Sequence, residues 1–130
     1  MKKQTEEKIQ NQIVLWFSKT YPPNKGIIFS VPNEGITKIL GAVQYKMKGN
    51  PVVATVADLA AITGNTMKSL GMLRGVSDLV VVLPRKILFV EVKMGAGVQT
   101  KAQKLFQARC EALGQEYHLI RSLDEFKALM

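Results

Sequence analysis

One stretch limits the fold more than any other: residues 77–93 read SDLVVVLPRKILFVEVK. Two apolar runs flank a proline and two basic residues, which is typical of two β-strands joined by a short turn. The pattern predicts strands over about 78–83 and 87–93. The chain therefore contains a largely buried β-hairpin.

The second strand of this hairpin ends in charged residues. Side chains alternate across a strand, so Glu91 and Lys93 lie on one face. If Arg85 and Lys86 form the turn, Asp78 lies opposite Lys93, and directly paired residues share a face. Both acids and the lysine would then gather at one place, whereas a register change of one residue would turn Asp78 away.

This cluster suits a particular chemistry. Two neighbouring carboxylates repel each other unless a cation or a proton lies between them. Their hard oxygen ligands suit Mg²⁺ or Mn²⁺, and a nearby ammonium can orient an attacking water. Together these groups suit metal-assisted phosphodiester hydrolysis. The alternative is a solvated charged stripe that protects an edge strand from aggregation, but the additional aspartate favours a site.

The remaining elements follow from apolar spacing and cap residues. We expect a helix over 5–18 capped by Thr5, a short strand from Ile27 to Pro32, a helix over about 55–70, a helix over about 101–113 capped by Thr100, a strand over 116–121, and a last short helix with a capping box from Ser122 to Glu125. On the helix after Thr100, the inward-facing residues are expected to be Ala102, Leu105, Phe106, Cys110 and Leu113. This order predicts a single α/β domain over 1–130 with a small mixed sheet flanked by helices.

The charge is positive and unevenly distributed. The net charge of +8 favours a polyanionic partner, either nucleic acid or anionic lipid. A basic segment, expected to be helical over about 36–70, and the residues just after it contain a single acid, Asp58. Their basic residues are Lys38, Lys46, Lys48, Lys68 and Arg74. This region is a candidate for phosphate contacts, and the alternative is a solvated lysine-rich face.

Several classes are disfavoured. No apolar run approaches the roughly 20 residues that span a bilayer, and no long amphipathic basic helix is evident, so no membrane partner is expected. The polar start, MKKQTEEKIQ, lacks the apolar centre of a signal peptide. The single cysteine, Cys110, cannot form an internal disulfide, which predicts a reducing, cytoplasmic setting.

The motifs also resemble a known family. RGVSDLVVV followed by ILFVEVK resembles the PD-(D/E)xK nuclease signature, with Ser77 where that signature often has proline. EEKIQNQIVLWF, VPNEG, LGMLRGVSDL, FVEVK, a glycine loop and TKAQKLFQARCEALGQEYHLIRSLDEF resemble the VRR-NUC family, in the family's order. Residues 38–68 do not align with it.

This resemblance implies a restriction-endonuclease-like core and divalent-metal nuclease activity. It implies that Asp78 and Glu91 bind the metal, that the backbone carbonyl of Val92 is a further ligand, and that Lys93 is the catalytic lysine. The family also places a glutamine near the site on the following helix, which Gln103 matches.

Two further positions are assigned less directly. Glu6 matches an acid on the first helix of the family, because it precedes Gln10 by four residues, and Glu7 is the rival. Asn33 belongs to a segment that is either a plain turn or a loop at the rim of the site, with Asn33 or Glu34 facing DNA.

The sequence thus leads to a divalent-metal-dependent DNA endonuclease, a phosphodiesterase that uses Mg²⁺ or Mn²⁺. One domain has one active site but cutting two strands needs two, so we expect a homodimer acting on branched DNA such as a four-way junction. A minimal nuclease of this kind is compatible with a phage, in which case it would act in the host-cell cytoplasm. The alternative is a non-catalytic nucleic-acid-binding module that retains the nuclease fold.

Overall fold

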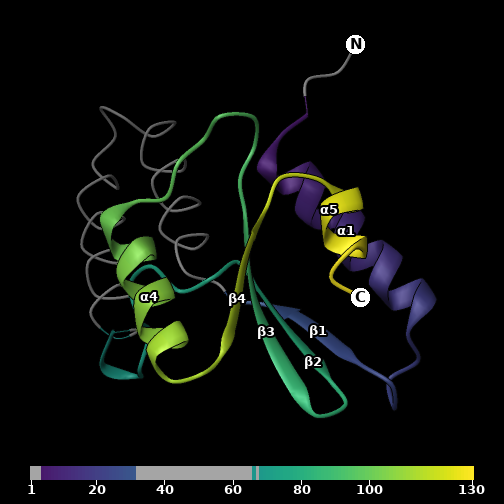
Figure 1. Cartoon of the computed structure of the whole chain (residues 1–130), viewed down its shortest axis with the longest axis horizontal. Helices are drawn as coiled ribbons and strands as arrows, with labels where there is room; N and C mark the ends of the chain where they lie inside the picture. The colour runs from purple at the N-terminus through teal and green to yellow at the C-terminus, as the bar shows by residue number, and fades with distance from the viewer. Residues whose placement is uncertain (1–3, 32–65, 67) are drawn as a thin grey trace, which may run out of the picture. The chain divides into compact units, whose positions relative to one another are not determined.

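The computed structural model describes residues 4–31, 66 and 68–130 (Figure 1). The expected basic segment and the expected helix over 55–70 lie almost wholly outside these residues.

Contacts divide the chain into two compact units. The first consists of Met1–Val31 with Gly75–Met130, and the second of Pro32–Arg74. In the second unit the structure describes a helical end at Thr66, Lys68 and Ser69. All elements named below belong to the first unit.

The first unit is built on one four-stranded sheet. Its strands are β1 Ile27–Ser30, β2 Leu79–Leu83, β3 Lys86–Val92 and β4 Glu116–Ile120, and they lie in the order β1-β2-β3-β4. The first three strands pair antiparallel, whereas β3 and β4 pair parallel. The parallel pair requires a crossover, which α4 supplies. The predicted α/β class with a small mixed sheet is confirmed.

Helices cover both faces of this sheet (Figure 1). They are α1 Glu6–Thr20 and α5 Leu123–Lys127 on one face and α4 Lys101–Ala112 on the other. The predicted caps are present, since the side chains of Thr5, Thr100 and Ser122 each accept a hydrogen bond from a backbone N–H in the first turn. Within the described part of the chain, no helix has the length and apolar character needed to cross a membrane.

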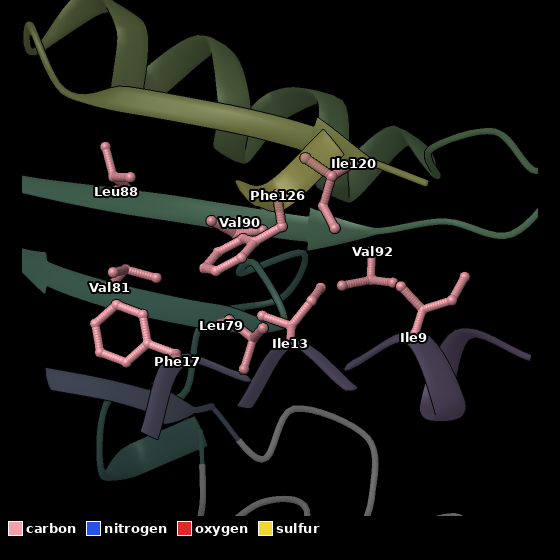
Figure 2. Close-up of a cluster of buried hydrophobic side chains, with 10 residues drawn as sticks. All are labelled: Ile9, Ile13, Phe17, Leu79, Val81, Leu88, Val90, Val92, Ile120 and Phe126. Carbon is pink, nitrogen blue, oxygen red and sulfur yellow. The ribbon is translucent and has the colours of Figure 1, made fainter. Parts of the chain in front are cut away.

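The main core lies between the sheet and α1 with α5 (Figure 2). Ile9, Ile13 and Phe17 project from α1 onto the strands, and Phe126 of α5 closes the cluster. Each such side chain contributes about 1.5–3 kcal/mol when fully buried. Because β2 and β3 direct alternate residues into this core, the residues between them point to the α4 face.

A smaller cluster packs α4 onto the other face. On this face, Phe106 and Cys110 of α4 form a buried cluster with Tyr117 of β4. The prediction that Leu105 and Leu113 also face inward is wrong, since both are exposed. Leu105 lies about 100° around the helix from Phe106, and Leu113 is the C-cap, past the last helical turn.

The turn of the hairpin differs from the expected one. Leu83 pairs with Lys86, so Pro84 and Arg85 form the turn, not Arg85 and Lys86. The fixed φ of proline suits the first central position of a type II turn, whose second position needs a positive φ. Arg85 has a φ of 69°. The proline therefore moves the turn one residue toward the N-terminus.

Candidate active site

The hairpin register sets which side chains meet at the site. Leu79 pairs with Val90, and one further step along the register places Asp78 opposite Glu91. The sequence predicted Lys93 as the residue opposite Asp78, so the predicted register is wrong by two residues. A shift of two preserves the face of a strand, so Asp78, Glu91 and Lys93 still lie on the same side. The predicted gathering of these groups is what the structure contains.

Asp78 is fixed where its segment enters the sheet. Its Oδ2 accepts a hydrogen bond of 2.8 Å from the backbone N–H of Val92, and its carbonyl accepts one of 3.1 Å from Val31. The neighbouring Ser77, at the position where the signature often has proline, is buried and donates from Oγ to the carbonyl of Leu79. These contacts hold the carboxyl of Asp78 at the end of β3.

Glu91 is the most deeply buried charged group of the site, with 1% of its surface exposed. Its Oε1 accepts a 2.8 Å hydrogen bond from Nε2 of Gln103 and lies 3.8 Å from Nζ of Lys93. Its Oε2 is also buried, and among the residues that the structure describes no donor reaches it. The carboxyl of Asp78 lies within hydrogen-bonding reach of Glu91, so the two acids can form a hydrogen bond only when one of them is protonated. An unpaired buried carboxylate oxygen is costly and usually marks a place for an ion, a water or a proton.

The electrostatics support this interpretation. Burial raises the pKa of Asp78, and the negative charge of Glu6 raises it further, against the Val92 N–H and Lys93. Burial, and then the charge of Asp78, raises the pKa of Glu91 to about 8, although Lys93 opposes the rise. The two carboxyl groups therefore need either a proton or a cation between them at neutral pH.

Gln103 connects the site to the start of α4. It is the third residue of the helix, and its Oε1 accepts a 2.8 Å hydrogen bond from the N–H of Thr100, which completes the capping box. The other end of the same amide, Nε2, donates to Glu91. The cap therefore orients the amide of Gln103 toward the carboxyl of Glu91. The resemblance implied only that this glutamine lies near the site, and its role there stays a prediction.

The first helix contributes Glu6 rather than Glu7. A methyl group at Gly97, next to Lys93, would lie 3.8 Å from Oε1 of Glu6, and the charge of Glu6 reaches Asp78. Glu7 instead lines a groove that includes Phe29. Glu6 is thus the acid on the site's side of α1, and its catalytic role stays a prediction.

The side chain and the backbone of Val92 lie in different surroundings. Its side chain points into the main core, away from the site (Figure 2). Its N–H binds Asp78. The backbone of Val92 therefore belongs to the site, and ligation by its carbonyl remains a prediction.

The predicted nucleic-acid-binding residues lie either outside the described residues or in the second unit. Lys38, Lys46, Lys48 and Asn33 lie outside the described residues. Lys68 and Arg74 are exposed and belong to the second unit. Their contacts with DNA remain a prediction.

Two features next to the site were not predicted from the sequence. Tyr117 is buried beside Glu91 in space: its hydroxyl accepts a 3.0 Å hydrogen bond from Gln99, and burial and the charge of Glu91 raise its pKa. Gly75 lies so close to α4 that a Cβ there would overlap the carbonyl of Ala102. The alternation of side chains along β3 and β4 could have placed Tyr117 on the α4 face, because Tyr117 pairs with Phe89 on that face.

The donor set fits a hard divalent cation. Within the described residues, no three or more His, Cys, Asp or Glu side chains are grouped so that they could hold a metal ion. A cation at this site would have the carboxyls of Asp78 and Glu91 as ligands and would need further oxygens from water or substrate. Mg²⁺ commonly takes one or two carboxylates and completes its shell with water and substrate oxygens. The buried, unpaired Oε2 of Glu91 is the observation on which this fit rests.

Fold and site together define an α/β protein with a mixed four-stranded sheet and a pair of carboxyls beside a lysine at the end of its hairpin. A solved structure described as "VRR_NUC domain protein" superposes on 99% of this chain and 87% of its own, with a TM-score of 0.65 and 16% sequence identity. The likeness confirms the VRR-NUC fold that the motifs predicted. No family model matches the sequence, and a search of curated proteins finds no match.

Proposed function

We propose that the protein is a divalent-metal-dependent DNA endonuclease that hydrolyses phosphodiester bonds. The observation that carries this proposal is the buried Oε2 of Glu91, unpaired among the described residues, in a carboxyl that also faces Asp78 and Lys93. Two acids with raised pKa values at one place are typical of functional sites. The shared fold with a VRR_NUC domain protein supports the same conclusion.

The residues of the site divide the work. Asp78, Glu91 and the carbonyl of Val92 would hold Mg²⁺ or Mn²⁺, which would polarise the scissile phosphate and offset its developing charge. Lys93, 8% exposed and held 3.8 Å from Glu91, would orient the attacking water. Gln103 keeps the carboxyl of Glu91 in place through its hydrogen bond.

The proposed partner is DNA. The net charge of +8 supports binding to a polyanion through its phosphates, largely independent of sequence. Lys38, Lys46, Lys48, Lys68, Arg74 and Asn33 are the residues that we propose for these contacts. Since one domain has one active site, we further propose that a homodimer acts on branched DNA, including four-way junctions.

A panel of linear, flap, splayed and four-way DNA substrates with Mn²⁺ or Mg²⁺ tests this proposal. We expect metal-dependent cleavage that Lys93→Ala abolishes without loss of DNA binding. Lys19→Ala is the matched control, because Lys19 is exposed at the far end of α1. Binding without cleavage by the wild-type protein in both metals would instead support a non-catalytic binding module.

A further inference from the structure

Arg121, the residue after β4, clamps the loop that leads from β3 to α4. Its Nη1 donates hydrogen bonds of 2.7 Å to the carbonyl of Gly95 and 2.8 Å to the carbonyl of Gly97. Glu125 accepts a bond from the backbone N–H of Arg121, not from its guanidinium. Within residues 4–31, 66 and 68–130, no ion pair involves this guanidinium. Its contacts there are therefore directed at the loop.

The clamped loop adjoins the reactive groups. It begins directly after Lys93, and the N–H of Gly97 donates to the carbonyl of Met94 at 2.9 Å, which closes a turn. A methyl group at Gly97 would lie 3.8 Å from Cδ of Lys93 and 3.8 Å from Oε1 of Glu6. The turn thus packs along the stem of the lysine and faces the acid of α1.

The 94–97 turn contains two glycines, so its conformation depends on contacts from outside the turn. Gly95, with a φ of 55°, and Gly97 have wide backbone freedom, so the turn has little stiffness of its own. The side chain of Lys93 is long, and its ammonium must stay near Glu91 to orient a water. A guanidinium whose donors are fixed by two carbonyls supplies the missing rigidity.

We propose that Arg121 is a positioning residue: by holding the 94–97 turn, it fixes the side chain of Lys93, and the approach of Glu6, for the reaction. This inference rests on the proposed nuclease function. The competing role is a direct contact between Arg121 and a DNA phosphate, and the two roles differ in what a substitution changes. A clamp acts on turnover of bound DNA, whereas a phosphate contact acts on DNA affinity.

The first experiment follows amide hydrogen exchange of Gly97 in the metal-free protein. Arg121→Gln removes the clamp, so we expect exchange at Gly97 to become at least about tenfold faster, with a smaller change in Arg121→Lys. Arg109→Gln is the matched control, because Arg109 is exposed near the end of α4. Equal exchange at Gly97 in Arg121→Gln and wild type would overturn the clamp, whether or not the protein cuts DNA.

The second experiment measures kcat and KM on whichever DNA substrate the wild type cuts. A small displacement of a reacting group costs up to about 100-fold in rate, so we expect Arg121→Gln to lower kcat about 10–100-fold with KM within about twofold. Arg121→Lys should recover part of kcat, because it keeps a cationic donor near the turn. A raised KM with unchanged kcat would overturn the positioning role.

The two experiments separate the possible failures. If the wild type cuts none of the substrates, the proposed function fails while the exchange data still decide whether the clamp exists. If the wild type cuts and Arg121→Gln cuts equally well, the positioning role fails alone. A thermal melt of each variant identifies unfolding, and Arg121→Lys then supplies the comparison.

Discussion

The buried carboxyl of Glu91 links the stability of the metal-free protein to pH. The folded protein raises its pKa from 4.5 to about 8, so the folded state holds a proton that the unfolded chain has released. The unfolding free energy should therefore decrease as pH rises from about 4.5 to about 8, and this contribution levels off above that range. Thermal melts in EDTA between pH 5 and pH 9 measure this slope. Added Mg²⁺ at about 100 times its Kd should restore about 2.7 kcal/mol at the alkaline end.

Asp78→Asn isolates the repulsion between the two carboxyls. The amide oxygen of asparagine can still accept the N–H of Val92, but the charge that raises the pKa of Glu91 is gone. We expect the metal-free variant to be about 1 kcal/mol more stable than wild type at pH 8, or roughly 4 °C in Tm, and to lose cleavage. The exposed Asp124→Asn serves as control. A variant that melts below wild type at pH 8 would contradict the proposed repulsion.

Gln103→Glu separates the two roles of the Gln103 side chain. Glutamate at this position still completes the capping box with Thr100, but it replaces the donor to Glu91 with a third negative charge. We expect a loss of about 1–3 kcal/mol in the metal-free protein at pH 8 and a larger gain in Tm on adding Mg²⁺ than wild type shows. The exposed Gln115→Glu should show neither effect. Equal Mg²⁺ responses would mean that Gln103 does not adjoin the cation site.

At the scale of elements, the hairpin shows what the sequence can and cannot predict. The apolar runs on either side of Pro84 were enough to predict β2 and β3, and alternation was enough to place Glu91 and Lys93 on one face. The predicted register was wrong because the position of the turn depends on which residue adopts a positive φ. That residue is Arg85, and non-glycine residues rarely adopt a positive φ. The predicted site is nevertheless correct in its face of the sheet, because a register shift of two residues leaves each side chain on the same face.

Other features depend on tertiary approach and have no local signal. The sequence left Glu6 and Glu7 as rivals because both precede the apolar face of α1, and only the packing of the helix distinguishes them. The clamp on the 94–97 turn likewise joins residues more than 20 positions apart. Motif order could suggest Gln103, but not the fact that a helix cap aims its amide at Glu91.

The contact between Gly75 and α4 makes a prediction about how the helix is placed. Gly75→Ala would push a methyl group into the backbone of Ala102 and Gln103, at a φ of 82° that disfavours alanine. Because backbone atoms cannot move aside as a side chain can, α4 must shift and carry Gln103 away from Glu91. We expect a loss of about 3 kcal/mol or more in stability by urea unfolding, together with reduced cleavage.

Gly114→Ala is the matched control for this substitution. Gly114, at the other end of α4, has a φ of 76°, but a Cβ there would meet no atom within 4 Å. It should therefore show only the backbone cost of about 1–2 kcal/mol, with cleavage retained. Equal losses for the two variants would mean that close packing at Gly75 does not position α4.

At the scale of the whole molecule, one edge of the sheet is apolar and is unpaired within the described residues. β1 ends the strand order, and its outer edge pairs with no strand in the described part of the chain. Ile27 and Phe29 on this strand are 53% and 46% exposed, and Ile87 of β3 lies on the same face. An exposed apolar edge strand can pair with a strand of another chain, and β1 offers four residues for such pairing. This edge is therefore where we place the interface of the proposed homodimer.

Ile27→Glu tests both the dimer and its link to junction cutting. A charge on an exposed strand position should leave Tm within a few degrees of wild type but prevent two apolar edges from pairing. In sedimentation at micromolar concentration, the wild type should be a dimer and the variant a monomer, while the exposed Leu15→Glu on α1 remains dimeric. On a four-way junction, the monomer should make single nicks where the wild type makes paired incisions, because the second active site is no longer held in place. A monomeric wild type that still makes paired incisions would show that two strands can be cut without symmetry.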